Sequence, residues 1–262
     1  MKRILRIFIA LVLIFFMGFI AAGGKDALRP ETFARMMDSV KLPDAKNEPA
    51  ESDSAMERIK RFIFLPDAVN ERVTSVHFVP VGELPNRLSE AVISVEDSRF
   101  YRHPGFDMEA IIRAALINLQ QGEVTQGAST ITQQLVKNLF LSPEQTFSRK
   151  VDELVLAIDF EARYSKNEIL SLYLNTIYFG SGYYGIYDAA HGYFGKDPQA
   201  LNLPEAAMLA GIPNAPSIYS PYEDFIMAKK RQFVVLDAMV KNGYIDEKTA
   251  EAAKIEPLFL AH

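Results

Sequence analysis

The sequence predicts a mainly α-helical protein, and three observations lead to this fold class. Apolar residues recur every three or four positions through most of the chain, which is the period of a helix with one buried face. Several of these runs begin with a capping residue or end at a glycine. Stretches with period two are scarce, and 73–79 is the best strand candidate.

The first element is a predicted N-terminal transmembrane helix, assigned to 1–24. Basic residues at positions 2, 3 and 6 precede an apolar run at 7–22, and this order predicts a cytoplasmic N-terminus. With its flanking residues the run approaches the roughly 20 residues that span a bilayer. A cleaved signal peptide is the alternative, because Ala21 and Ala22 are small enough for processing.

A linker and a folded domain follow this anchor. Residues 25–70 include a polar patch with Pro43 and Pro49, which is typical of a linker or a loosely packed stalk. Residues 71–262 have the size of a single domain. The net charge of −5 argues against nucleic acid as a partner, and the absence of cysteine excludes disulfides and thiol chemistry.

Within the domain, each expected helix has an apolar face and a recognisable start. Ser165 and Asn202 each begin a capping box, in which a glutamate follows three residues later. The helix that opens near Arg149 has its apolar positions at Val151, Leu154, Val155, Ile158 and Ala162. Expected helices begin near Pro85, Asp107, Ser129, Arg149, Ser165, Asn202, Asp224 and Asp246, and Gly122 and Gly243 end two of them.

The densest group of polar side chains lies at the start of the helix that Ser129 is expected to cap. Thr130, Gln134 and Lys137 are spaced i, i+4 and i+7, so they share one stripe. Hydroxyls, amides and a cation beside a helix N-terminus are typical of an anion site. An ordinary polar helix face explains this segment, taken alone, equally well. The core stripe of the same helix consists of Ile131, Leu135 and Leu139.

Two further polar clusters accompany this one. Glu96 and Asp97 come at the C-terminal end of a predicted helix, where the helix dipole disfavours carboxylates, so stability alone does not explain them. Arg149, Lys150 and Glu153 open another helix. Arg149 and Glu153 are i and i+4, so the alternative is a surface ion pair, which contributes about 0.3–0.5 kcal/mol.

Together the three clusters resemble those of the peptidoglycan glycosyltransferases of family 51, which join lipid-linked disaccharide units into glycan strands. The resemblance extends from about Leu84 to Gly243, with the family's order and spacing of motifs. It departs at Ser171, where the family usually carries glutamate, and at Tyr187-Asp188; both positions are expected to support packing. The matching motifs are EDSRF with H-x-G-x-D (Glu96–Asp107), QGASTITQQLVKNLFL (Gln126–Leu141), RKVDE (Arg149–Glu153), KNEILSLYLN (Lys166–Asn175), YFGSGYYGI (Tyr178–Ile186), YFGK (Tyr193–Lys196) and LAGIPNAPSIYSP (Leu209–Pro221).

The resemblance implies a fold and a mechanism. The fold is a lysozyme-like helical lobe with a smaller membrane-facing jaw lobe, preceded by the transmembrane helix. The reaction is inverting transfer of a lipid-pyrophosphate-linked glycan chain to the 4-hydroxyl of lipid II, with Glu96 as the base and Glu153 near the departing pyrophosphate. We expect both carboxylates to face one cleft. The implied substrate contacts are Asp97, Phe100, His103, Thr130, Gln133, Gln134, Lys137, Asn138, Arg149 and Lys150.

The implied partners are lipid II, the growing lipid-linked glycan chain and the lipid bilayer, together with penicillin-binding transpeptidases and division proteins. The domain is expected on the extracytoplasmic, periplasmic side of the plasma (inner) membrane. No Ser-x-x-Lys or Lys-Thr-Gly signature of the family's transpeptidase module occurs, which favours a monofunctional polymerase. No cofactor is expected, but a Mg²⁺ or Mn²⁺ ion at the pyrophosphate, near Glu153, stays an open alternative.

Three alternatives remain at this point. For Asp97, Phe100 and His103, a capped and internally satisfied turn competes with direct substrate contact. For the whole chain, one rival function is a glycan-cleaving lytic transglycosylase or lysozyme, which needs no pyrophosphate pocket. The other is a catalytically silent membrane scaffold of a wall-building complex, and the presence of both Glu96 and Glu153 argues against it.

Overall fold

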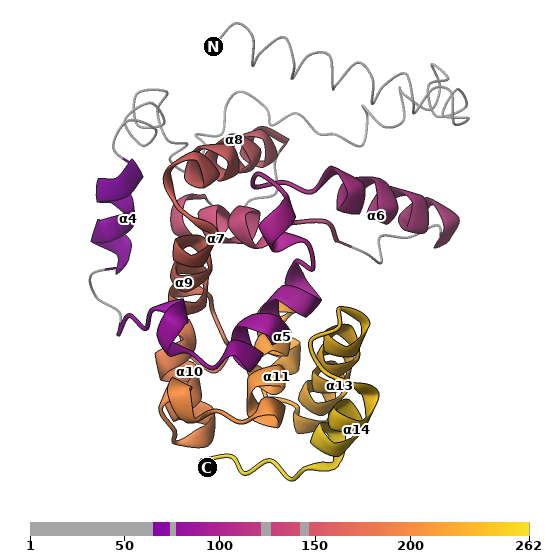
Figure 1. Ribbon diagram of the computed structural model, residues 1–262. Coiled ribbons are helices and arrows are strands. Elements are labelled where there is room, and N and C mark those ends of the chain that lie inside the picture. Colours follow the sequence, from indigo (N-terminus) through magenta and orange to yellow (C-terminus); the bar gives the residue numbers. More distant parts are fainter. Residues whose placement is uncertain (1–64, 74–76, 122–126, 142–146, 262) are drawn as a thin grey trace, which may run out of the picture. The chain divides into compact units, whose positions relative to one another are not determined.

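The computed structural model describes residues 65–73, 77–121, 127–141 and 147–261, and this part of the chain is mainly helical (Figure 1). The predicted transmembrane helix at 1–24 and most of the predicted linker lie outside it. No helix in the described ranges is long and apolar enough to cross a bilayer. The mainly helical class is therefore confirmed, whereas the anchor and the division into a lysozyme-like lobe and a jaw stay predictions.

Helices connected by short turns account for most of the described chain. The helices are α4 (Leu65–Val73), α5 (Asn86–Glu96), α6 (Met108–Gln121), α7 (Ile131–Phe140), α8 (Phe147–Arg163), α9 (Lys166–Thr176), α10 (Gly185–Phe194), α11 (Leu203–Gly211), α12 (Pro216–Tyr219), α13 (Phe225–Lys241) and α14 (Glu247–Ile255). Single 3₁₀ turns are η2 (Val81–Glu83), η3 (Phe100–Arg102), η4 (Pro198–Ala200) and η5 (Ile212–Asn214).

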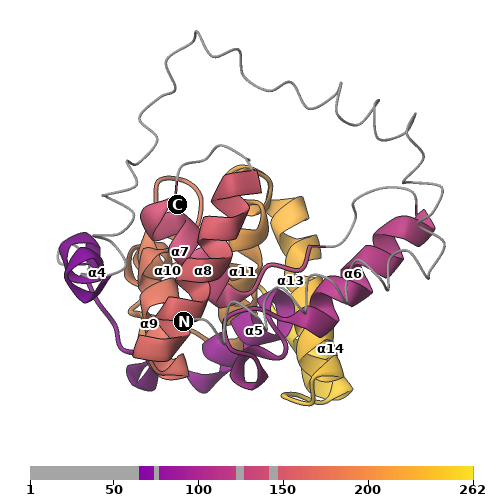
Figure 2. The ribbon, with the colours of Figure 1, turned by 90° about the horizontal axis from the view of Figure 1, so that it is seen from above.

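Two groups of helices position the polar clusters. In the first, α11 is buried along its whole length, and α5 and α13 both pack against it. Because α11 consists mostly of alanine and other apolar residues, it can be covered on every side. In the second group, α7 packs against α8 and α9 (Figure 1 and Figure 2). The C-terminal end of α5 meets the N-terminal end of α7, where Asp97 accepts from Ile131 N–H at 3.0 Å.

The predicted strand at 73–79 is wrong for the residues that the structure describes, which form the end of α4 and an irregular segment. The side-chain amide of Asn175, on α9, takes the place of a neighbouring strand. It accepts from Val79 N–H and donates to Val79 C=O, both at 2.8 Å. One turn earlier, Ser171 Oγ accepts from Val81 N–H at 2.9 Å. Ser171 thus supports the segment that leads into α5.

Most of the predicted helix starts are confirmed. The side chains of Asp107, Ser165, Asn202, Asp224 and Asp246 each accept a hydrogen bond from the third residue of the helix that follows. The expectation that Ser129 caps α7 is wrong by one residue. Thr130 Oγ1 accepts from Gln133 N–H and Gln133 Oε1 accepts from Thr130 N–H, both at 3.1 Å, so these two residues form a capping box.

Helix α8 buries a different face from the predicted one. Val151, Val155 and Ile158 are 39%, 44% and 42% exposed. The buried positions of the helix include Glu153, Leu156, Ala157 and Phe160. Phe160 packs against Phe140 of α7, with 6.2 Å between the ring centroids. Because α8 carries apolar residues on two faces, periodicity alone does not indicate which face its neighbours cover.

Helix α4 crosses the predicted boundary between linker and domain at 70/71. Leu65 and Val69 are spaced i and i+4, and they are 0% and 2% exposed. Both belong to the same hydrophobic core as buried residues of α5, α7 and α9. The last residues of the predicted linker are therefore part of the folded structure.

Candidate active site

Glu96 is the last residue of α5, and its side chain is 5% exposed. Gln134 Nε2, on α7, donates to Glu96 Oε2 at 2.7 Å, and Arg231 Nη2, on α13, lies 3.7 Å from Oε1. Within the described residues, Oε1 has no hydrogen-bond partner. Burial raises the pKa of Glu96, and the Gln134 hydrogen bond and the charges of Arg231 and Lys137 oppose this rise without cancelling it. A carboxyl group with a raised pKa and one oxygen that makes no hydrogen bond can act as a general base.

A polar cavity of about 260 Å³ lies beside Glu96. The ends of α5 and α13, the start of α6 and the segment before α7 surround it. Its lining includes hydroxyl, amide and cationic groups from Ser94, Ser98, Arg113, Ser129, Lys241 and Asn242. The carboxylates of Glu96, Asp97 and Asp107 line the cavity as well, so it suits a ligand that carries many hydroxyl groups.

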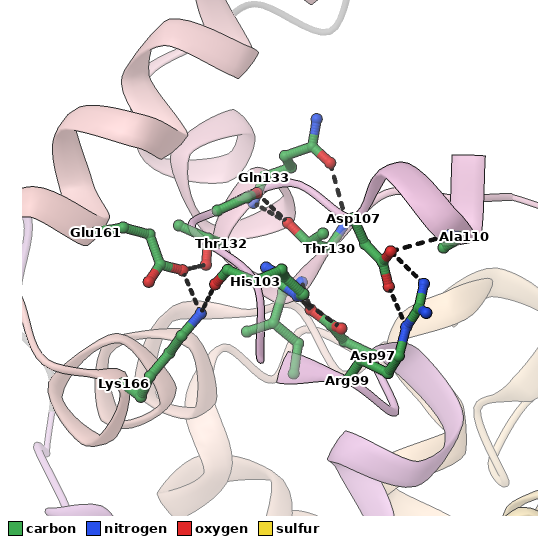
Figure 3. Close-up of polar contacts among 12 residues, drawn as sticks. Asp97, Arg99, His103, Asp107, Ala110, Thr130, Thr132, Gln133, Glu161 and Lys166 are labelled. Atoms are coloured by element: carbon green, nitrogen blue, oxygen red, sulfur yellow. Dashed lines mark hydrogen bonds and ion pairs between the residues drawn. The ribbon is translucent and has the colours of Figure 1, made fainter. Parts of the chain in front are cut away.

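Asp97 ties the end of α5 to the turn that follows and to the start of α7 (Figure 3). Its two carboxylate oxygens lie 2.9 and 3.0 Å from His103 Nε2, and Oδ2 also accepts from Ile131 N–H. A carboxylate at a helix N-terminus satisfies a free N–H and interacts favourably with the dipole. Thr130 Oγ1 donates to Gly105 C=O at 2.7 Å, which attaches the same turn to α7 a second time.

Lys166 also binds this turn and connects it to α8 (Figure 3). Its Nζ donates to His103 C=O and to Glu161 Oε1, both at 2.7 Å, and lies 4.5 Å from the centre of the Phe100 ring. Thr132 Oγ1, on α7, also donates to Glu161 Oε1, at 2.6 Å. The side chains of Lys166 and Glu161 are 20% and 9% exposed. A mostly buried ion pair therefore joins α7, α8 and α9 to the turn after Glu96.

Arg99 and Asp107 fix the two ends of the turn to each other. Arg99 Nε donates to Asp107 Oδ2 at 2.8 Å, and Arg99 Nη2 contacts Oδ1. Ala110 N–H donates to the same Oδ1 at 2.9 Å. Burial acts to raise the pKa of Asp107, but the hydrogen bonds from Arg99 and Ala110 outweigh it, so the pKa is lowered. Asp107 can thus cap α6 and hold Arg99 as a carboxylate.

Several residues predicted to touch substrate already form these contacts within the protein. Phe100 is fully buried, and Asp97, His103, Thr130 and Gln133 all bond within the turn or the α7 cap. For Asp97, Phe100 and His103 this arrangement supports the alternative of a satisfied turn. Asp97 and Thr130 also line the cavity, and substrate contact by all five residues stays a prediction. By contrast, Gln134 touches Glu96, Lys137 is half-buried within electrostatic range of it, and Asn138 is exposed on α7.

Glu153 and the cations of α8 lie near the edge of the cavity. Lys150 Nζ forms an ion pair with Glu153 Oε1 and donates at 3.3 Å to Ser129 Oγ, which lines the cavity. Glu153 is 3% exposed and does not line this cavity in the described part of the chain. The expected common cleft for Glu96 and Glu153 is therefore not found there, and Lys150 connects Glu153 to Ser129 at the cavity edge. Arg149 precedes Lys150 on α8 and is half-buried.

The sequence patterns do not identify two residues near this site. Arg231 lies on the buried stripe of α13, between Ala228 and Val235 at helical spacing, and a charge on such a stripe is the signal that could have found it. Tyr173 is fully buried on α9, and its hydroxyl donates to Gln134 Oε1 at 3.1 Å. A buried tyrosine needs a partner for its hydroxyl, which is the corresponding signal here.

Comparisons with known proteins agree with the motifs. Residues 67–240 match the family model described as Transglycosylase. A Cupriavidus necator protein, provisionally named a transglycosylase, is 45% identical over 183 residues, which cover 70% of this chain and 79% of that protein. Penicillin-binding protein 1A of Vibrio cholerae is 49% identical over 176 residues, 67% of this chain and 21% of the relative.

Further matches involve proteins that are much longer than the matched region. Penicillin-binding protein 1A of Escherichia coli K12 is 46% identical over 180 residues, covering 69% of this chain and 21% of its own length. The chain therefore spans about a fifth of the two penicillin-binding proteins named here. A crystal structure of penicillin-binding protein 1A from Haemophilus influenzae matches 71% of this chain and 18% of its own, at 24% identity and a TM-score of 0.42.

Proposed function

The chain belongs to the transglycosylase family, and from this membership we propose that it is a peptidoglycan glycosyltransferase that polymerises lipid II into glycan strands. One structural observation carries the proposal. Glu96 combines a buried, hydrogen-bonded carboxyl oxygen with a second oxygen that has no hydrogen-bond partner in the described chain, and it lines a polar cavity. This is the environment expected for a carboxylate that removes a proton from a hydroxyl group.

In the proposed reaction, Glu96 accepts the proton of the acceptor's 4-hydroxyl as that oxygen attacks the anomeric carbon. The bond from the anomeric carbon to the lipid pyrophosphate breaks on the opposite side, so the configuration inverts. The raised pKa of Glu96 makes it a stronger base than an exposed glutamate, and its cause is burial. Gln134 fixes one oxygen of the carboxylate, which leaves the other oriented for the incoming hydroxyl.

The departing pyrophosphate requires positive charge, and we assign this role to Lys137, Arg149 and Lys150. Glu153 would act on this group indirectly, because its ion pair holds Lys150 near Ser129 at the cavity edge. The residues that the structure describes contain no group of three or more acidic or histidine side chains suited to a metal ion. No step is derived through a Mg²⁺ or Mn²⁺ ion, which stays an alternative near Glu153, because the Glu153 carboxylate is paired with Lys150.

Two exposed apolar stripes support a location at the membrane surface. Met108, Ile112 and Leu116 follow one side of α6 and are 39%, 49% and 55% exposed. The exposed face of α8, formed by Val151, Val155 and Ile158, is the second stripe. Apolar side chains in such rows suit contact with lipid, which is where a lipid-linked substrate resides. We place the domain on the extracytoplasmic side, where transpeptidases and division proteins are its proposed protein partners.

The deciding experiment supplies the purified full chain with lipid II in one assay and with finished cell wall in another. The proposal predicts polymer from lipid II and no fragments from the wall. Fragments without polymer would indicate a lytic enzyme, and neither product would indicate a silent scaffold. Glu96→Gln should abolish polymerisation without changing the thermal melt, whereas Glu251→Gln, an exposed control on α14, should leave the rate unchanged. Normal product from Glu96→Gln would refute the assignment of the base.

A further inference from the structure

We propose that Tyr173 is a positioning residue that orients the Gln134 side-chain amide toward Glu96 and so determines the pH range in which Glu96 can accept a proton. The inference rests on the proposed function, in which Glu96 is the base. It concerns three side chains from three helices, Tyr173 on α9, Gln134 on α7 and Glu96 on α5.

The contacts form a chain that runs from the core to the cavity. Tyr173 is fully buried, and its hydroxyl donates to Gln134 Oε1 at 3.1 Å. The amide nitrogen of Gln134 donates to Glu96 Oε2 at 2.7 Å. A primary amide presents its oxygen and its NH₂ group in different directions, so a hydroxyl donor on the oxygen side determines that NH₂ faces the carboxylate.

The Tyr173 hydroxyl stays protonated, and this maintains the orientation of the Gln134 amide. Burial, and then the neighbouring carboxylates of Glu96 and Asp97, raise the pKa of Tyr173 well above its ordinary value. The hydroxyl therefore keeps its proton and remains available as a donor. Were the Gln134 amide turned round, its oxygen would face Glu96, and two acceptors would meet unless Glu96 were protonated. The orientation of the amide and the ionisation of Glu96 are thus coupled.

Other charged groups also act on Glu96, but their effect does not depend on this orientation. Lys137 from α7 and Arg231 from α13 favour the carboxylate, whereas the neighbouring Asp97 and burial disfavour it. Among the influences that lower the pKa of Glu96, the hydrogen bond from Gln134 is the largest. A residue that controls this hydrogen bond therefore controls the largest influence that lowers the pKa of Glu96 against the effect of burial.

The consequence for activity has a definite sign. A base must be deprotonated, so the rate falls as the pH drops below the pKa of Glu96. Tyr173→Phe removes the donor to Gln134 Oε1, lets the amide turn its oxygen to Glu96 and favours the protonated acid. The acid limb of the pH–rate profile should move to higher pH by about one unit, with a roughly tenfold lower rate at pH values below the limb. The rate on the alkaline side should be retained.

The test compares the full-length wild type with Tyr173→Phe and Tyr193→Phe. Tyr193 is equally buried, but its hydroxyl donates to Phe179 C=O at 2.8 Å, so it is a matched control for the loss of a buried hydroxyl. The pH–rate profile with lipid II is one measurement. The second is a carbon-13 NMR titration of the Glu96 carboxyl, identified by the signal that Glu96→Gln removes. We expect Tyr173→Phe to shift both titrations and Tyr193→Phe to shift neither.

A double-variant comparison separates positioning from general disruption. In a Gln134→Leu background, Tyr173→Phe should add no further shift to the Glu96 titration, because the amide that connects Tyr173 to Glu96 has been removed. An additional shift there, or an unchanged Glu96 titration in Tyr173→Phe alone, would overturn the inference. The NMR measurement needs no substrate. If the wild type makes no polymer, the proposed function fails, while the shift in Tyr173→Phe still decides the role of Tyr173.

Discussion

Replacing Lys166 with methionine tests whether the contacts of Lys166 with the turn after Glu96 are a main source of local stability. Lys166 donates to His103 C=O and pairs with Glu161, which is 9% exposed. Methionine keeps an apolar stem against the Phe100 ring, so the packing changes little. The substitution removes both hydrogen bonds and leaves the Glu161 carboxylate without its positive partner.

The expected loss follows from the burial of this pair. Removing one partner of a buried ion pair costs about 3–5 kcal/mol. Because Lys166 remains 20% exposed, solvent screens part of the interaction, and we expect about 2–3 kcal/mol. In a domain of this size each kcal/mol lowers Tm by about 2–4 °C. Lys166→Met should therefore melt roughly 4–12 °C below the wild type.

Lys254 provides a matched control on α14. It also pairs with two carboxylates, Asp237 and Glu251, both at 2.6 Å, but these are 64% and 62% exposed. Exposed pairs contribute about 0–1 kcal/mol, so Lys254→Met should change the melt little. Adding Glu161→Gln to Lys166→Met should recover part of the lost stability, because no unpaired charge remains buried. The melts are monitored by circular dichroism. Equal melting temperatures for Lys166→Met and Lys254→Met would refute this reasoning.

Two further predictions concern the backbone and the membrane. Gly185→Ala should destabilise by more than about 2 kcal/mol, because φ is +81° and the new Cβ would lie 2.5 Å from Asn175 C=O. Gly182→Ala, with φ +85° and no described atom within 4 Å, should lose only about 1 kcal/mol in the same thermal melt. Val155→Asp, at an exposed α8 position, should raise the KM for lipid II in vesicles about tenfold and leave Tm unchanged. Ile255→Asp, on α14, should not change that KM.

The helix starts could be predicted from the sequence because capping is local. Ser165 and Asn202 need residues only three positions away to complete their capping boxes, and both boxes form. The face that a helix buries depends instead on its neighbours. On α8 the apolar positions 151, 155 and 158 satisfy the helical period, yet the structure buries the face that carries Phe160. The strand prediction at 73–79 failed for a similar reason, because a side chain of α9 satisfies the backbone of that segment.

Residue types lead to a hypothesis about the chemistry of the site, but they could not show which polar groups bond within the protein. Thr130 and Gln133 look like ligands in the sequence, and in the structure they cap α7. Arg231 lies 3.7 Å from Glu96 but 135 positions later in the chain, so no local pattern connects the two. Proximity of this kind arises because α5 and α13 both pack against α11.

Glu96 and its neighbours differ in how well the protein satisfies their charged side chains. Glu96 itself is unfavourably placed, because its carboxyl is buried at the negative end of α5 and burial raises its pKa. Asp97, one residue later, accepts a hydrogen bond from Ile131 N–H at the positive end of α7. Asp97 and Lys166 use their charged groups in internal contacts, while Glu96 retains an oxygen without a hydrogen bond among the described residues. Removing the charge of Glu96 should consequently abolish activity without loss of stability, because burial disfavours the carboxylate more than Gln134, Arg231 and Lys137 favour it.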